Sequence, residues 1–150
     1  MKSCFFIGHR RTPQSVLPEL LAAVDRHIVE YGVREFVVGN YGEFDRIVVK
    51  ALLRAKRQYP EIILSLLIPY HPSQRAVQLP AGFDNTFYPP EMEKVPRQYA
   101  IVRANRYMVE HADYLIAYAW HPASNATNLV AYAKRREKKG QICVTKLNRN

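Results

Sequence analysis

Short apolar runs alternate along this chain with segments in which apolar residues recur every three to four positions. Such runs are typical of buried strands, and the recurrence is typical of helices that pack one face against a sheet. The predicted strands are residues 3–7, 34–38, 61–68, 113–119 and 141–146. The predicted helices are residues 16–31, 43–59, 97–111 and 127–139. Because strands and helices alternate, we expect the strands to form a parallel sheet.

This alternation predicts an α/β fold of three layers, with a doubly wound, mostly parallel sheet of about five strands, as in Rossmann-like proteins. The 150 residues suit one ordinary domain, so we expect a single domain over residues 1–150. Residues 69–96 break the pattern, because six of the ten prolines lie there. We expect a long loop with a short strand near residues 86–88, and loops of this length are usually functional or mobile.

Ligands of doubly wound sheets bind in the crevice beyond the carboxyl ends of the strands. Three predicted turns, residues 8–11, 39–45 and 120–128, reach that edge. They offer glycines, arginine and the N–H groups of helix starts, which together suit an anion. Asn105, a polar residue in the apolar stripe of its helix, and the neighbouring Arg103 are expected near the same edge. The candidate ligand-binding residues are Gly8, His9, Arg10, Gly39, Asn40, Gly42, Asp45, Arg103, Asn105, Trp120, Ser124, Asn125 and Thr127.

Each of these features also has a purely structural explanation, which the sequence leaves open. The small polar residues at 124–127 could serve only as helix N-caps. Glu43 and Asp45 could cap their helix, or one of them could bind ribose hydroxyls. Trp120 could stack on a base or pack against its strand. His9, Glu43 and Asp45 are also the candidates for acid or base catalysis, although no partner for His9 is evident in the sequence.

The formal net charge of +9 would favour anionic partners, but where the charge lies matters more than its sum. Two basic clusters, residues 54–57 and 134–139, fall at the C-terminal ends of predicted helices, where the helix dipole stabilises cations. Nucleic-acid binding is therefore an alternative that we do not favour.

The cysteines, the histidines and the first residues argue against a disulfide-rich, a metal-binding, a secreted or a membrane-spanning protein. Cys4 and Cys143 have no paired spacing, so we expect reduced core thiols in a cytoplasmic protein. The histidines lack the spacing of zinc ligands, and we expect no metal and no cofactor. The first apolar run ends at Gly8, which predicts neither secretion nor a membrane-spanning segment.

Four stretches carry a family resemblance: FFIGHR at 5–10, VVGNYGEFD at 37–45, VRANRYMVEHADYLIAYAW at 102–120 and SNATNLVAYAKRR at 124–136. Together they resemble the SLOG superfamily, the Rossmann-like group that contains Lonely Guy phosphoribohydrolases and the DNA-processing protein DprA, and specifically its small YpsA-like branch. The resemblance covers nearly the whole chain. It implies a Rossmann-like fold, a nucleotide-derived or phosphoribosyl ligand at the strand ends, and frequent homodimerisation.

The chain also departs from the pattern of that superfamily. Lonely Guy enzymes carry P-G-G-x-G-T-x-x-E, whose glutamate acts in cleaving the bond between base and ribose phosphate. Counted from Thr127, Val130 stands in place of that glutamate. The related branch usually has a glycine-rich segment resembling GGT before the last helix, where this chain has Asn125-Ala126-Thr127. Asn105 stands where those enzymes have a basic residue. These differences leave enzymatic activity uncertain.

Three functions follow from these observations. We favour the binding or sensing of a nucleotide-like or phosphate-containing small molecule. One alternative is a hydrolase that cleaves an N-glycosidic or phosphoester bond of a nucleotide. The other is nucleic-acid binding of the DprA type.

Overall fold

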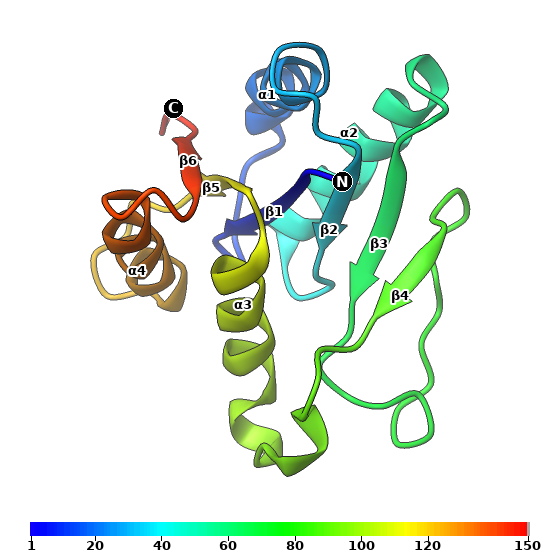
Figure 1. The fold of residues 1–150 in the computed structure, drawn as a ribbon, viewed down its shortest axis with the longest axis vertical. Coiled ribbons are helices and arrows are strands. Elements are labelled where there is room, and N and C mark those ends of the chain that lie inside the picture. Colours follow the sequence, from blue (N-terminus) through cyan, green and yellow to red (C-terminus); the bar gives the residue numbers. More distant parts are fainter. Residues whose placement is uncertain (150) are drawn as a thin grey trace.

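The computed structural model describes residues 1–149, which form a parallel β-sheet with helices on both faces (Figure 1). Within this range the sheet has six strands, in the spatial order β4-β3-β2-β1-β5-β6, and all neighbouring strands are parallel. The strands are β1 (Ser3–Gly8), β2 (Glu35–Val38), β3 (Ile63–Leu67), β4 (Asn85–Phe87), β5 (Tyr114–Tyr118) and β6 (Cys143–Lys146). The predicted three-layer, Rossmann-like α/β class is confirmed, with six strands instead of about five.

The helices lie in two pairs, one on each face of the sheet. α1 contacts α2 on one face, and α3 contacts α4 on the other. The helices are α1 (Leu17–Val29), α2 (Glu43–Gln58), α3 (Ala100–His111) and α4 (Asn125–Glu137). The predicted start of α3 was too early, because Arg97–Tyr99 forms a separate 3-10 turn. The predicted start of α4 was too late, because the cap is Ser124 and the helix begins at Asn125.

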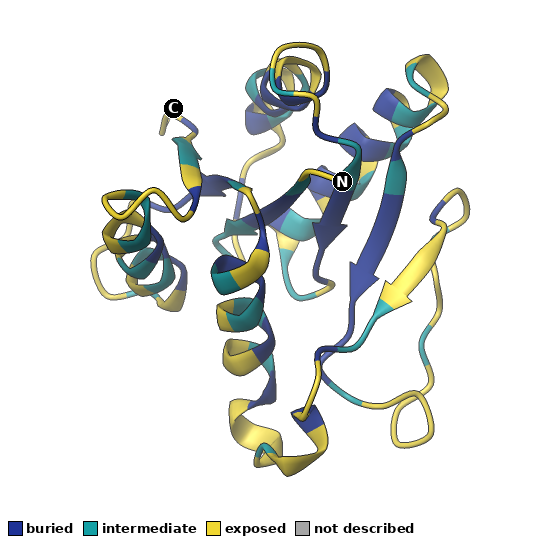
Figure 2. Cartoon of the chain, in the orientation of Figure 1, coloured by how far each residue is buried: buried dark blue, intermediate teal, exposed yellow. Residues whose placement is uncertain are grey.

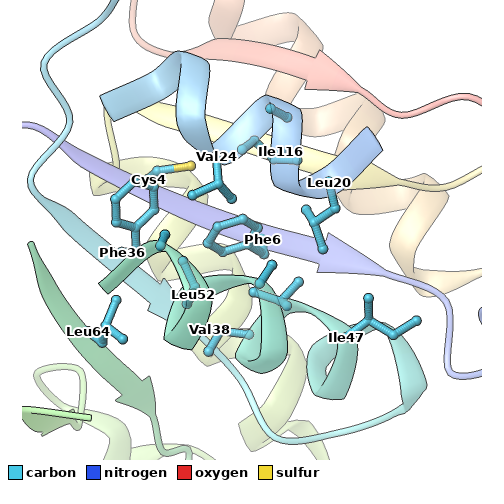
Figure 3. Close-up of a cluster of buried hydrophobic side chains, with 14 of the residues drawn as sticks. Cys4, Phe6, Leu20, Val24, Phe36, Val38, Ile47, Leu52, Leu64 and Ile116 are labelled. Carbon is cyan, nitrogen blue, oxygen red and sulfur yellow. The ribbon is translucent and has the colours of Figure 1, made fainter. Parts of the chain in front are cut away.

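Two apolar layers hold the helices to the sheet. Between the sheet and the α1–α2 pair, the strand side chains of Phe6 and Phe36 pack with residues such as Leu20 and Leu52 (Figure 3). On the other face, Phe5 packs with the buried side of α3 and α4. Successive residues of β1 thus enter opposite layers, because side chains alternate along a strand. This explains why the central strands read as unbroken apolar runs.

The two edges of the sheet differ from its centre. β4 is short and largely exposed, whereas β2 and β3 are buried (Figure 2). β6 forms the other edge, and Cys143 on it is exposed, while Cys4 in β1 is buried. The expectation that both cysteines are core thiols is therefore wrong for Cys143. An edge strand is covered less completely than a central one, and the apolar letters around Cys143 could not reveal that position.

The order of the strands creates a switch point at β1. From β1 the chain adds β2, β3 and β4 on one side, and α3 then returns it to β5 on the other side (Figure 1). The connections that leave the carboxyl ends of β1 and β5 diverge to opposite faces of the sheet. A crevice at such a point is where doubly wound sheets bind ligands.

Candidate functional site

A cavity of about 350 Å³ lies at the carboxyl end of β1, at this switch point, and reaches the end of β3. The turns after β1, β2 and β5 form one side of it, and α3 forms another. Eight of the residues singled out from the sequence line it: Gly8, His9, Arg10, Gly39, Asp45, Asn105, Ser124 and Asn125. The volume is at the lower end of the range for small-molecule pockets, roughly 300–1,000 Å³.

The other residues that line the cavity were not among the predicted ligand-binding residues. Tyr41 follows β2, and the other residues are mostly apolar side chains from strand ends and helix faces. They include Ile7, Leu67, Pro69, Ile101, Val102, Ala104, Ala126 and Leu129. In the sequence these residues belong to the same periodic pattern as the core, so no signal separates a cavity wall from a buried face.

The N-terminus of α4 supplies main-chain donors to the cavity. Ser124 is its N-cap, and its Oγ accepts a hydrogen bond of 3.1 Å from the N–H of Thr127. The first N–H groups of a helix have no partner within the helix, and here they belong to Asn125 and Ala126, which line the cavity. The positive end of the helix dipole points the same way. Capping and an anion-binding geometry therefore occur together at this turn.

His9 joins the loops after β1 and β5. Its Nε2 accepts hydrogen bonds from the main-chain N–H groups of Trp120, at 2.9 Å, and His121, at 3.2 Å. Nε2 is therefore unprotonated, and we assign the ring hydrogen to Nδ1. Burial lowers the pKa of His9, with a smaller contribution from His121. The partner that the sequence did not reveal is the backbone, and Nε2 is not free for proton transfer.

Asp45 is a half-buried carboxylate in the first turn of α2. Its Oδ2 accepts a hydrogen bond of 3.0 Å from the N–H of Tyr41. Burial raises the pKa of Asp45 to about 6, and the hydrogen bond from Tyr41 opposes that rise. At neutral pH the group is predominantly ionised, so it suits hydroxyl donors and repels a phosphate placed directly beside it.

The glycines of these turns make room for protein atoms. A side chain at Gly8 would overlap the ring of Phe44. Gly42 has a φ of +131°, and a Cβ there would lie 2.8 Å from the Cα of Arg10. The N–H of Glu43 also donates to the carbonyl of Arg10 at 2.7 Å. These contacts lock the turn after β1 against the start of α2 and so set the place of Arg10.

Five of the predicted ligand-binding residues do not line this cavity. Asn40 lines a neighbouring cavity, and Gly42 packs beneath Arg10. Arg103 lines a groove on the outer side of α3. The Thr127 hydroxyl donates to the carbonyl of His121 at 2.6 Å. Trp120 lies outside, with the guanidinium of Arg149 3.6 Å from its ring centroid.

The candidate catalytic residues are also separated. Asp45 and His9 line the cavity, whereas Glu43 is exposed and does not. In residues 1–149 no three or more histidine, cysteine or acidic side chains are grouped so that they could hold a metal ion. None of the helices in that range is long and apolar enough to cross a membrane.

No protein-family model matches this chain, and a search of curated proteins finds no match. The resemblance to the SLOG superfamily therefore stays a prediction.

Proposed function

We propose that the chain binds or senses a nucleotide-derived or phosphoribosyl molecule in the cavity at the carboxyl end of β1. The observation that carries this proposal is the position of the α4 N-terminus, which lines the cavity together with Arg10. Main-chain N–H groups at a helix start and an arginine are a recurrent combination for phosphate. The YpsA-like resemblance points to the same class of ligand.

The polar groups of the cavity suggest how the ligand lies. Its phosphate would lie at the first turn of α4, within reach of Arg10. Its ribose hydroxyls would donate to Asp45, because an ionised carboxylate only accepts hydrogen bonds. Asn105, half-buried on α3, would add an amide, and the apolar wall of α3 would cover the sugar.

The best test is thermal unfolding of the purified chain with ribose 5-phosphate and with nucleoside monophosphates. A ligand at a hundred times its Kd adds about 2.7 kcal/mol to the free energy of unfolding, which raises Tm by several degrees. We expect Arg10→Ala to abolish the shift, because it removes the cation of the site.

Arg11→Ala is the matched control, since Arg11 is exposed, adjacent in sequence and not part of the cavity lining. It should leave the shift unchanged. No shift with any of these compounds, or an equal shift in the Arg10→Ala variant, would refute the proposal.

A hydrolase is the second candidate function, because one titratable carboxylate lines the cavity. With a pKa of about 6, Asp45 has a proton affinity suited to acid or base catalysis near neutral pH. Release of free base from a nucleoside monophosphate, detected by chromatography and lost in Asp45→Asn, would favour this function. Binding without release would favour the sensor.

The position of the basic clusters does not favour nucleic-acid binding at the site. The basic clusters lie at the C-terminal ends of α2 and α4, at the edge of the sheet opposite the cavity. The homodimer implied by the resemblance stays a prediction. Tyr99 and Val102, exposed on and beside α3, mark the surface on which it would be sought.

A further inference from the structure

A second cavity of about 290 Å³ adjoins the first, at the carboxyl ends of β2 and β3. Tyr41, Leu67 and Pro69 line both spaces. Residues 75–78, from the loop between β3 and β4, line only the second one. Together the two linings run from the end of β1 and the first turn of α4 to the end of β3 and the loop that follows it. They form one elongated site with Tyr41 at its middle.

The second cavity exists because of an unusual connection. Parallel strands are ordinarily joined through a helix, but residues 68–84 connect β3 to β4 without one (Figure 1). Asp84 fixes the end of this loop, since its Oδ2 accepts hydrogen bonds from the N–H of Leu64, at 2.8 Å, and from Lys56 Nζ, at 2.9 Å. These contacts hold the end of the loop at the amino end of β3, while residues 75–78 in its middle line the second cavity at the carboxyl end.

Arg75 is the cation of this second cavity. Its guanidinium lies 5.4 Å from the ring centroid of Tyr70, and Arg97 lies 5.3 Å from the same ring. No carboxylate of residues 1–149 is within ion-pair distance of Arg75. Burial raises the pKa of Tyr41 above its usual value. The charge and hydrogen bonding of Arg75 lower that pKa, but by less than burial raises it. The guanidinium is thus placed between two tyrosines with donors left for a ligand.

The order of groups in a nucleotide matches the order of groups along this site. A nucleotide runs from phosphate through ribose to base. The proposed function places the phosphate at α4 and the ribose at Asp45, so the base comes next, beyond Tyr41. Asn40, Gln78 and Arg75 line the space that it would reach.

Resting on the proposed function, we infer that this second cavity holds the base of a nucleoside 5′-monophosphate, and that the base is a 6-oxopurine. Arginine offers only donors, in a planar fork. The O6 and N7 atoms of guanine are two neighbouring acceptors that match this fork, whereas adenine presents a donor beside N7. Tyr41 supplies an aromatic ring at the junction of sugar and base.

The test is calorimetric titration of the full chain with ribose 5-phosphate, guanosine 5′-monophosphate and adenosine 5′-monophosphate. We expect the guanosine nucleotide to bind at least tenfold more tightly than ribose 5-phosphate and more tightly than the adenosine nucleotide. Arg75→Ala should weaken its binding about tenfold and leave ribose 5-phosphate unchanged, because the sugar phosphate does not reach Arg75.

Arg54→Ala is the control, since this exposed arginine lies on α2 near its C-terminal end, away from both cavities. It should change no affinity, and both variants should unfold at the same temperature as the unchanged chain without ligand. Equal affinities for ribose 5-phosphate and the guanosine nucleotide, or no effect of Arg75→Ala, would overturn the base subsite while the proposed function stood. Tighter binding of the adenosine nucleotide would overturn the 6-oxopurine. Binding of none of the three would overturn both proposals.

Discussion

Asp45 lies at a position where burial disfavours the ionised form of its carboxyl group. Burial raises its pKa from 3.8 to about 6, although it accepts a hydrogen bond from Tyr41 and lies in the first turn of a helix. Both of those contacts favour the ionised form. A carboxylate kept at a cost in stability is typical of a binding or catalytic site. Its retention beside the cavity agrees with a role in ligand binding.

We expect Asp45→Asn to stabilise the fold at pH 7 by about 1–2 kcal/mol, less than the full shift would give, because the side chain is half-buried. The amide oxygen can still accept from Tyr41. A raised carboxyl pKa means that the charge destabilises the fold fully above about pH 6, and that this effect is lost as the pH falls towards 4. Urea unfolding between pH 4 and 8 measures the difference, which should vanish at the acid end. A less stable variant at pH 7 would contradict this account.

His27 is a second buried titratable residue, far from the cavity. It is fully buried, its Nδ1 lies 2.7 Å from the carbonyl of Ala23, and its Nε2 has no partner. The rings of Tyr31 and Tyr114 lie edge-on to it, at 4.9 and 5.4 Å. Burial is the largest of the effects that together lower the pKa of His27 below 6.5. The folded state therefore favours the neutral ring.

Stability should consequently fall as the pH drops through about 6.5, because the unfolded chain takes up a proton that folded His27 resists. Above that range the contribution of His27 is constant. His27→Phe keeps an aromatic ring and should flatten the pH dependence between 7 and 5. His111→Phe is the matched control, since His111 makes the same kind of contact, to the carbonyl of Tyr107 at 2.8 Å, but is exposed. Equal slopes for the two variants in urea unfolding would refute this assignment.

At the scale of elements, the start of α2 depends on one glycine. Gly42 is the N-cap of α2, and its φ of +131° is a backbone conformation that other residues rarely adopt. Gly140, beyond α4, also has a positive φ, of +72°, but a Cβ there would meet no atom within 4 Å. Both glycines have a positive φ, but only at Gly42 would a Cβ also lie too close to a neighbouring atom.

We expect Gly42→Ala to cost about 2–4 kcal/mol in the free energy of unfolding, from backbone strain and from contact with Arg10. Gly140→Ala should cost about 1 kcal/mol, from strain alone. Because Gly42 packs on Arg10, its variant should also weaken ligand binding, as a thermal-shift titration would reveal. Equal costs at the two positions would contradict the role of the contact.

The elements with a clear period were predictable, and those set by tertiary contacts were not. The runs at β1 and β3 and the amphipathic stripes of the helices follow directly from burial on one or both faces. β4 was only indicated within the loop, because two of its three residues are exposed, so it carries no apolar pattern and depends on pairing with β3. The 3-10 turn before α3 has the same composition as a helix start.

At the scale of the whole molecule, the position of the site follows from topology. Parallel strands bring all their carboxyl ends to one edge, so the turns at Gly8, Gly39 and Ser124 could be grouped before any coordinates were known. The sequence could not show that the side chains of Arg103 and Trp120 point away from the cavity, because their directions depend on packing. The second cavity was only hinted at, by Asn40 and by the length of the loop, because its shape depends on the course of that irregular loop.

The hydrogen bonds that His9 accepts also bear on how the loops around the cavity can move. One ring nitrogen receives the N–H groups of Trp120 and His121, so the loop after β1 and the loop after β5 are joined at a single acceptor. Neither loop can swing away from the other without breaking both bonds. We therefore expect these two loops to move together, and an opening that admits a ligand to come from the opposite side of the cavity, formed by α3 and residues 68–84.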